Sequence, residues 1–413
     1  MASDPARTAA QRLLAAALSG RGRLEPALEG LGGLSPIDRA FGRALVMACL
    51  RHLGPIDAVL DRRLSRPPPA PIRDLMRLGM AQAFWLKVPA FAAVDSVVAL
   101  APQRWRGLIN AVLRGQLREG MPADGAEELA PAWLMARWRA AYGVTDAAAI
   151  AAAIAAEPDT DLTFKAAATP DRLAELGGHA LAGGTIRTSR RGELSTWPGF
   201  AEGEWWVQDA AAAVPGRLLP QPGQTVLDLC AAPGGKTLQL ASGGATVTAV
   251  DRSESRLQRL RENLKRIGLL AELVVADATD WSDERGFDAV LLDAPCSATG
   301  AFRRHPDVLW NARPGDIAAL AGAQAKLLRS AARRVKPGGL LVYSVCSLEK
   351  EEGEAQLADF LAADHEFSIA PIASGEGGSP VASLTPQGWL RILPHHLDGG
   401  IDGFFIARLR RRA

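Results

Sequence analysis

The stretch VLDLCAAPGGKT, residues 226–237, decides the fold of the larger part of this chain. A short apolar run leads into a turn of small residues and then a helix-compatible segment, which predicts a strand, a tight turn and a helix. Small residues let the main chain approach a ligand closely, and the first N–H groups of a helix are free donors. The turn is therefore a candidate site for a nucleotide-like ligand.

Two familiar glycine motifs do not fit this turn. The tripeptide Gly235-Lys236-Thr237 suggests a phosphate-binding loop, but the first glycine of that motif would fall on Cys230. The turn also lacks the G-x-G-x-x-G pattern of dinucleotide-binding enzymes. A nicotinamide dehydrogenase, the main competitor with the same topology, is therefore disfavoured.

The sequence around the turn alternates short apolar runs with amphipathic helices from Gly223 onward. This alternation is typical of a parallel sheet with helices on both faces. The expected strands are 225–229, 246–250, 272–276, 289–292 and 340–344, with a last hairpin ending in 403–409, and the expected helices include 254–266 and 316–335.

Acidic residues stand at the ends of the first three strands. Asp251 follows Asp228 by 23 residues, near the separation of about 20 expected for an acid that binds ribose hydroxyls. Asp277 ends the third strand, where a carboxylate can accept a hydrogen bond from an adenine amino group. One such acid is more often a loop or capping residue. Three in succession favour a nucleoside-bearing ligand, and a methyl donor fits better than a dinucleotide.

Two cysteines follow the next two strands. Cys296 lies in LLDAPCSATG (residues 291–300), three residues after Asp293, and Cys346 lies in YSVCSL (residues 343–348). The carboxyl ends of parallel strands share one edge of a sheet, so these side chains are expected to face one crevice with the acids. A lone cysteine in an apolar run is more often a packing residue. Two thiols beside an acid are harder to explain by packing.

Cytosine offers a reaction for such a pair of thiols. Carbon 5 of cytosine accepts a methyl group only after a nucleophile, such as a thiolate, adds to carbon 6. An acid that hydrogen-bonds ring nitrogen 3 assists the addition, and Asp293 is placed for this role. A second thiol can help to release the product. The base must leave its stack, which costs least in single-stranded or looped RNA.

The 413 residues are too many for one ordinary core, so we expect several domains. The four cysteines include no close pair typical of zinc sites or small disulfide frameworks, and no apolar run reaches the roughly 20 residues of a membrane helix. We expect a soluble cytoplasmic monomer without metal, acting on RNA and neither on DNA nor at a membrane.

The part of the chain before the α/β region differs in pattern and charge. Apolar residues recur at three and four through residues 1–120, which predicts helices, with a break at RPPPAP (66–71) and a boundary at 120–125. Residues 36–118 carry 13 Lys or Arg against 5 Asp or Glu, although the whole chain has a net charge of only +2. Such a basic module is suited to phosphate contacts, although a solvated helical surface would look the same.

Between these regions, residues 131–156 predict two further helices and residues 157–206 a small α+β segment. We therefore expect three domains: an all-α domain over 1–125, a helical and α+β connector over 126–205, and an α/β domain over 206–413.

Several segments together resemble one family, the RsmB branch (Sun and Fmu) of the RsmB/NOP RNA 5-methylcytosine methyltransferases. The α/β segments are DLCAAPGGKT, AVDRS, DAPCSATG followed by RRHPDVLW, YSVCSLEKEE, WWVQD and DGFFIA. The segments DRAFGRALVMACLRHLGPIDAVL and LINAVLRG resemble a NusB-type RNA-binding domain. The resemblance spans nearly the whole chain and implies a class I, Rossmann-like methyltransferase domain that uses S-adenosylmethionine.

The resemblance also implies roles for particular residues. Cys346 would be the nucleophile and Cys296 would serve product release, whereas DNA cytosine methyltransferases use the Pro-Cys position as nucleophile. Asp293 would lie between cofactor and base, Asp251 would bind the ribose and Asp277 the adenine. The methionine and ribose part of S-adenosylmethionine would contact Cys230, Ala231, Ala232, Pro233, Gly234, Gly235 and Lys236.

The sequence departs from the family pattern beside the nucleophile. Val345 stands where threonine is frequent, and Lys350 and Gly353 replace a common proline and asparagine. These changes put the local loop geometry in question more than the chemistry. The expected substrate is small-subunit (16S) ribosomal RNA. The alternatives are transfer RNA, a DNA or protein methyltransferase of the same fold, and an RNA-binding regulator with an inactive methyltransferase domain.

Overall fold

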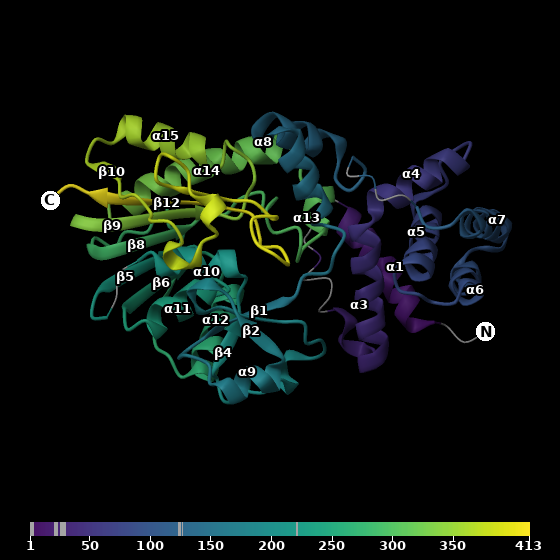
Figure 1. Cartoon of the computed structure of the whole chain (residues 1–413), viewed down its shortest axis with the longest axis horizontal. Coiled ribbons are helices and arrows are strands. Elements are labelled where there is room, and N and C mark those ends of the chain that lie inside the picture. The colour runs from purple at the N-terminus through teal and green to yellow at the C-terminus, as the bar shows by residue number, and fades with distance from the viewer. Residues whose placement is uncertain (1–3, 20–23, 25–29, 123–124, 126, 220–221) are drawn as a thin grey trace. The chain divides into compact units, whose positions relative to one another are not determined.

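The computed structural model describes residues 4–19, 24, 30–122, 125, 127–219 and 222–413. These residues form two compact units (Figure 1). The helical unit comprises Met1–Glu157 together with Phe302–Ala312, and the α/β unit comprises Pro158–Ala301 and Arg313–Ala413. Within the described ranges, no helix is long and apolar enough to cross a bilayer.

The helical unit follows the predicted pattern of helices with short connections. Ser35 caps α3 by accepting a hydrogen bond from the N–H of Asp38 at 3.1 Å. The predicted break at 66–71 separates α4 from α5, and Gly120 (φ 101°) ends α7. The predicted boundary at 120–125 begins at this glycine, and its residues 123 and 124 lie outside the described part. The helices are α1 (Pro5–Leu18), α3 (Pro36–Arg51), α4 (Leu53–Arg63), α5 (Ala70–Phe84), α6 (Ala90–Leu100), α7 (Gln103–Glu119) and α8 (Ala132–Ala152).

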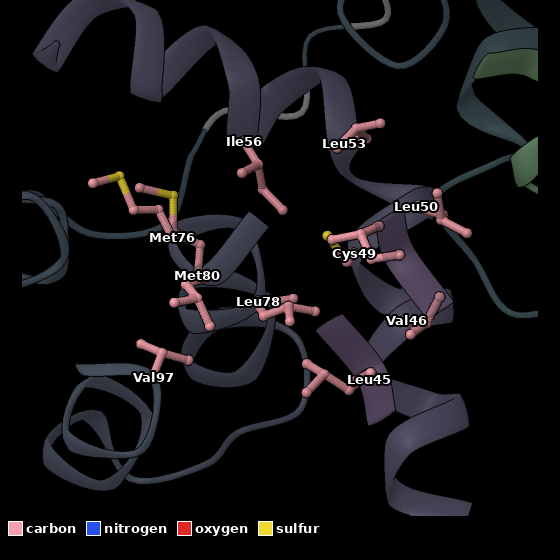
Figure 2. Packing of buried hydrophobic residues seen from close by; sticks show 14 of the residues in the cluster. Leu45, Val46, Cys49, Leu50, Leu53, Ile56, Met76, Leu78, Met80 and Val97 are labelled. Carbon is pink, nitrogen blue, oxygen red and sulfur yellow. The ribbon is translucent and has the colours of Figure 1, made fainter. Parts of the chain in front are cut away.

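Side chains from α3, α4, α5 and α6 meet in the core of this unit (Figure 2). Leu45, Val46, Cys49 and Leu50 recur at three- and four-residue spacing on α3 and are fully buried. Burial raises the pKa of the Cys49 thiol far above its usual range. Cys49 therefore packs as a small hydrophobic side chain.

The segment Phe302–Ala312 packs in the helical unit, although the sequence places it with residues 206–413. The Arg51 guanidinium donates to the carbonyl oxygen of Arg303 at 2.7 Å, and Trp310 Nε1 donates to a carbonyl of α3 at 3.0 Å. These bonds join positions about 250 residues apart, which no local pattern predicts. The segment contains the short helix α13 (Asp307–Asn311).

The predicted connector, residues 126–205, is divided between the two units. Its helical part is α8. Gly143 (φ 85°) interrupts this helix and divides it into two parts, which correspond to the two predicted helices. Its other part is an antiparallel sheet in the order β2-β3-β1-β4. The buried pair Asp161–Arg187 (2.7 Å) fastens this sheet internally. The elements are β1 (Thr160–Phe164), α9 (Pro170–Leu176), β2 (Gly178–Ala180), β3 (Ile186–Thr188) and β4 (Trp205–Val207).

The α/β unit contains an eight-stranded sheet in the order β10-β12-β9-β8-β5-β6-β7, with β11 also paired to β12. β7, β6, β5, β8 and β9 are parallel, and β12 is antiparallel to both β9 and β10. Helices α14 and α15 cover one face of the sheet and α10, α11 and α12 the other (Figure 1). The strands are β5 (Thr225–Leu229), β6 (Thr246–Asp251), β7 (Glu272–Val275), β8 (Phe287–Asp293), β9 (Val335–Val345), β10 (Phe367–Ile369), β11 (Leu390–Ile392) and β12 (Phe404–Arg411). The helices are α10 (Ala210–Arg217), α11 (Gly235–Ser242), α12 (Glu254–Ile267), α14 (Pro314–Ala332) and α15 (Glu354–Ala363).

All five predicted parallel strands are present, with ends that differ by a few residues. The clearest error is the predicted helix 316–335, which ends at Ala332 because Val335 already pairs with Phe287 in the sheet. The reversed strand β12 separates β9 from β10, so the sheet differs from the all-parallel order of dinucleotide-binding domains. This arrangement is the Rossmann-like sheet of class I methyltransferases.

Candidate active site

The candidate site lies at the carboxyl edge of the parallel strands. The chain runs outward from β5 through β6 to β7 and then returns to β8 on the other side of β5. In open α/β sheets, ligands bind at such a reversal of strand order. The predicted site residues lie within or directly after the ends of β5, β6, β7, β8 and β9.

The turn after β5 brings α11 close to the sheet. Cys230 has a positive φ of 61°, and Gly234 (φ 108°) precedes the first residue of α11. A side chain at position 234 would collide with Leu260 of α12. Gly234 is therefore required by helix packing and by its backbone angle, a reason that differs from the close approach to a ligand expected from the sequence.

Asp251, at the end of β6, is tied to this turn. Its Oδ2 accepts a hydrogen bond from the N–H of Ala232 at 3.1 Å, and its Oδ1 accepts one from the N–H of Ser253 at 2.9 Å. Each carboxylate oxygen can accept a further bond. Asp251 can therefore still bind ribose hydroxyls, which need acceptors.

Asp277 lies two residues beyond β7 and is exposed. Among the described residues, the hydrogen bonds to its carboxylate come from Thr279, at 2.6 Å from the hydroxyl and 2.9 Å from the backbone N–H. These bonds lower the pKa of Asp277, so it is ionised at neutral pH. No bond joins it to the other predicted site residues in the described part of the chain. Its carboxylate is accessible to an adenine amino group.

Asp228, inside β5, is fully buried. Its Oδ2 accepts a hydrogen bond from Thr237 Oγ1 at 2.6 Å, whereas its Oδ1 is buried and has no hydrogen-bond partner among the residues that the structure describes. Burial raises the pKa of Asp228 to about 7. A buried polar atom without a partner is uncommon in folded proteins and is consistent with a ligand group at this turn. Together with the accessible acceptors on Asp251 and Asp277, it fits the methionine and adenosine parts of S-adenosylmethionine.

Lys236 connects the cofactor turn with β8. Its Nζ lies 2.8 Å from Oδ2 of Asp293, and Asp293 Oδ1 accepts a hydrogen bond from Ser344 Oγ at 2.8 Å. Burial alone lowers the pKa of Lys236, but the charge of Asp293 and its hydrogen bond raise the pKa above the ordinary value. Lys236 is therefore a buried cation, and Cys346 also interacts with it electrostatically.

The two cysteines lie side by side. The Sγ atoms of Cys296 and Cys346 are 3.5 Å apart. Cys296 is buried, and its pKa is raised well above the ordinary value by its hydrogen bond to Cys346, by burial and by the charges of Cys346 and Glu352. Cys346 is partly exposed. Cys296 is thus a thiol at neutral pH, and Cys346 is the more accessible sulfur.

The sequence interpretation missed a set of polar residues around these cysteines. Glu352, Ser297, Ser347 and Thr299 form a buried or half-buried network between the two cysteine turns. Glu352 ends the segment YSVCSLEKEE, to which the family resemblance extends, but the sequence assigned it no role. Its burial in a polar turn leaves no periodic signal.

The departures from the family pattern are also explained locally. Val345 is fully buried and pairs with Phe405 in the sheet. Lys350 forms an ion pair with Glu354 at 2.8 Å. A side chain at position 353 would crowd Arg391 and the Phe405 ring, so Gly353 leaves room for those two residues.

One cavity of about 480 Å³ lies at the opposite edge of the sheet. Residues at the amino ends of four neighbouring strands line it, including Thr225, Thr246, Glu272 and Phe287. None of the predicted site residues lines this cavity. The cavity is separate from the chemistry at the carboxyl edge.

The sheet order and this edge define an S-adenosylmethionine-dependent methyltransferase. Two sequence families match the chain: 16S rRNA methyltransferase RsmB/F over residues 216–410 and the NusB family over residues 4–118. Together with relatives that are 37–38% identical over about 90% of the chain, these matches show that the chain belongs to the RsmB/F family of RNA methyltransferases and carries a NusB domain over residues 4–118.

Individual relatives support the same assignment over most of the chain. Ribosomal RNA small subunit methyltransferase B of Xanthomonas campestris pv. campestris is 38% identical over 396 residues, covering 90% of this chain and 91% of the relative. The protein of the same name from Salmonella arizonae is 37% identical and covers 91% of each chain.

Two solved structures also match. The crystal structure of PH0851 has a TM-score of 0.78 and 26% identity and covers 100% of this chain and 99% of that chain. A methyltransferase homolog protein from Pyrococcus horikoshii has a TM-score of 0.56 and 28% identity, covering 68% of this chain and 95% of that chain.

Proposed function

We propose that this protein methylates carbon 5 of a cytosine in small-subunit ribosomal RNA, with Cys346 as the covalent nucleophile. The observation that carries the proposal is the pair of sulfurs 3.5 Å apart, one partly exposed and one buried, which follow the ends of β8 and β9. A methyl transfer without a covalent step does not require two thiols at the carboxyl edge of the sheet, where the base must enter.

The proposed roles follow from the surroundings of each side chain. The Lys236 ammonium interacts electrostatically with Cys346, and the thiolate is the reactive form of a cysteine nucleophile. Addition of that thiolate to carbon 6 makes carbon 5 nucleophilic. Lys236 and Ser344 orient Asp293, which would face ring nitrogen 3 of the cytosine. S-adenosylmethionine, when bound, supplies the methyl group.

Release of the product requires a base to take the carbon 5 proton. The electron pair of that C–H bond then re-forms the double bond between carbons 5 and 6 as the bond between carbon 6 and the Cys346 sulfur breaks. Cys296 remains a thiol and lies in contact with that sulfur. Its S–H can donate a hydrogen bond to the departing Cys346 thiolate. We therefore assign product release to Cys296.

The remaining proposed roles concern recognition. Asp251 would bind the ribose of the cofactor, Asp277 its adenine, and the turn from Cys230 to Lys236 its methionine part. The NusB-like unit would contact RNA phosphates. It carries exposed basic side chains, among them Arg39 and Arg43 on α3.

The test is transfer of labelled methyl groups to small-subunit ribosomal RNA that lacks its own modifications. We expect 5-methylcytidine in the digested product by mass spectrometry, with none from Cys346→Ala. Cys49→Ala, which alters a cysteine of the helical core, is the matched control and should retain transfer. An active Cys346→Ala beside an inactive Cys296→Ala would reverse the roles of the cysteines. Methylation of transfer RNA alone would overturn the ribosomal assignment.

A further inference from the structure

Glu352 lies between the two cysteine turns and is fully buried. Its Oε1 accepts a hydrogen bond from the N–H of Ser297 at 2.9 Å. Its Oε2 accepts hydrogen bonds from the hydroxyls of Ser297 and Ser347, each at 2.5 Å. Ser297 directly follows Cys296, and Ser347 directly follows Cys346. One carboxylate is therefore bonded to the residue after each cysteine.

We propose that Glu352 is a positioning residue that holds the Cys296 and Cys346 turns together, so that both sulfurs act on the same base. The inference deepens the proposed function and depends on it for the identity of the reaction. The positioning itself concerns two sulfur atoms and can be measured without RNA.

Glu352 is itself fixed by the surrounding fold. The hydroxyl of Tyr343, on β9, donates to the Glu352 carbonyl oxygen at 2.6 Å. Gln324 Nε2, on α14, donates to Glu352 Oε1 at 3.1 Å. A strand and a helix thus anchor both ends of this residue.

Two further hydrogen bonds join the same turns without Glu352. The N–H of Gly300 donates to the Cys346 carbonyl oxygen at 3.0 Å, and the N–H of Leu348 donates to Thr299 Oγ1 at 3.0 Å. These contacts keep the turns adjacent. Glu352 bonds the residues next to the sulfurs and thereby adjusts the spacing of the thiols.

The hydrogen bond to Cys346 and burial raise the pKa of the Cys296 thiol, and the charge of Glu352 raises it further. Cys296 therefore stays protonated while Cys346 reacts. The carboxylate both places the two thiols and helps to keep them chemically different.

Two substitutions separate bonding from charge. In Glu352→Gln, the amide oxygen can replace Oε1, and the amide NH2 can donate to the two serine hydroxyls, which also accept hydrogen bonds. This variant loses the charge but keeps the clamp. Glu352→Ala loses both. Glu351→Gln, at the exposed neighbouring carboxyl, is the matched control.

The first measurement is the rate at which diamide oxidises Cys296 and Cys346 to a disulfide, followed by mass spectrometry in the absence of RNA. The two thiols lose two protons and two electrons, and the diazene bond of diamide is reduced to a hydrazine. Glu352→Ala should slow this cross-link about 10-fold and lower kcat about 100-fold, because small displacements of reacting groups have large effects, with KM within about 3-fold. Glu352→Gln and Glu351→Gln should cross-link no more than about 3-fold slower than the unmodified protein.

The second measurement is alkylation of each cysteine as a function of pH. Glu352→Gln should bring the reaction of Cys296 to lower pH, because a negative charge near its thiolate is gone. An unchanged profile would remove the charge effect. If Glu352 had only a structural role, Glu352→Gln would not shift the pH profile of Cys296 alkylation while leaving the cross-linking rate unchanged.

The outcomes distinguish this inference from the proposed function. A folded Glu352→Ala with unchanged cross-linking and unchanged kcat would overturn the positioning role, even if cytosine is methylated. If Glu352→Ala slows cross-linking but the unmodified protein makes no 5-methylcytidine, the positioning role would be supported and the proposed reaction would be contradicted. If Glu352→Ala does not fold, Ser347→Ala removes one bond of the clamp with little change in volume. Cross-linking and kcat that are both unaffected by Ser347→Ala would equally contradict the positioning role.

Discussion

The Nζ atom of Lys236 and Oδ2 of Asp293 are 2.8 Å apart, which joins the first residues of α11 to the end of β8. The family resemblance implies that Lys236 contacts the cofactor and that Asp293 lies between the cofactor and the target base. Their ion pair means that the two halves of the proposed site are electrostatically connected. A change at either residue should therefore affect stability as well as methyl transfer.

Asp293→Asn should destabilise the protein by about 2 kcal/mol, because it leaves the buried Lys236 ammonium without its counter-charge. The value is below that of a fully buried pair since the Asp293 side chain is 31% exposed. Urea unfolding measures it. Lys336→Met is the control. It removes the ion pair with Asp288, in which the Lys336 side chain is 44% exposed, and should lower the free energy of unfolding by less than about 1 kcal/mol. Equal losses in both variants would contradict the prediction.

Cys296→Ala should accumulate a covalent complex between Cys346 and RNA, because addition to carbon 6 proceeds while release is impaired. A band of reduced mobility on a denaturing gel detects the complex. The band should disappear in the double variant Cys296→Ala/Cys346→Ala. A Cys296→Ala protein that turns over normally and shows no such band would remove the release role.

Asp228→Asn should change the pH dependence of stability. The pKa of Asp228 is raised by burial to about 7 in the folded protein and is about 3.9 in an unfolded chain. The folded state therefore binds more protons between these values, and the contribution of Asp228 to stability falls as pH rises from about 4 to about 7. Asparagine cannot ionise, so the variant should gain stability relative to the unmodified protein across this range. Urea unfolding at several pH values tests this, and a pH-independent difference would show that the pKa of Asp228 is not raised.

Replacing Arg39 and Arg43 by glutamine should weaken RNA binding, because two exposed charges of α3 are removed. If each contacts one phosphate, the slope of log affinity against log salt should fall by about 1.5 to 2. Filter binding over a range of salt concentrations measures the slope, and kcat should be preserved. The matched control removes Arg285 and Lys336, which lie near the amino ends of β8 and β9. The same loss of slope in that control would mean that α3 has no special part in binding.

Much of the fold was predictable because local sequence patterns determine where its helices and strands form. The alternating apolar runs located all five parallel strands, and the proline-rich stretch 66–71 overlaps the break between α4 and α5, although α5 already begins at Ala70. The ends were less accurate, as at Val335, where pairing with Phe287 converts the end of a predicted helix into a strand. Pairing across a sheet is a property of two segments, so one segment alone does not reveal it.

By itself, the sequence determined that strand ends would present acids and cysteines to one edge, because parallel strands place their carboxyl ends together. Only the tertiary structure decided that the Cys296 and Cys346 sulfurs are in contact, that Glu352 bonds both turns, and that Phe302–Ala312 packs with the helical unit. The physical reason is the range of the interactions. Periodicity and turn chemistry act over a few residues, whereas the sulfur contact joins positions 50 residues apart and the bond from Arg51 to Arg303 joins positions 252 apart.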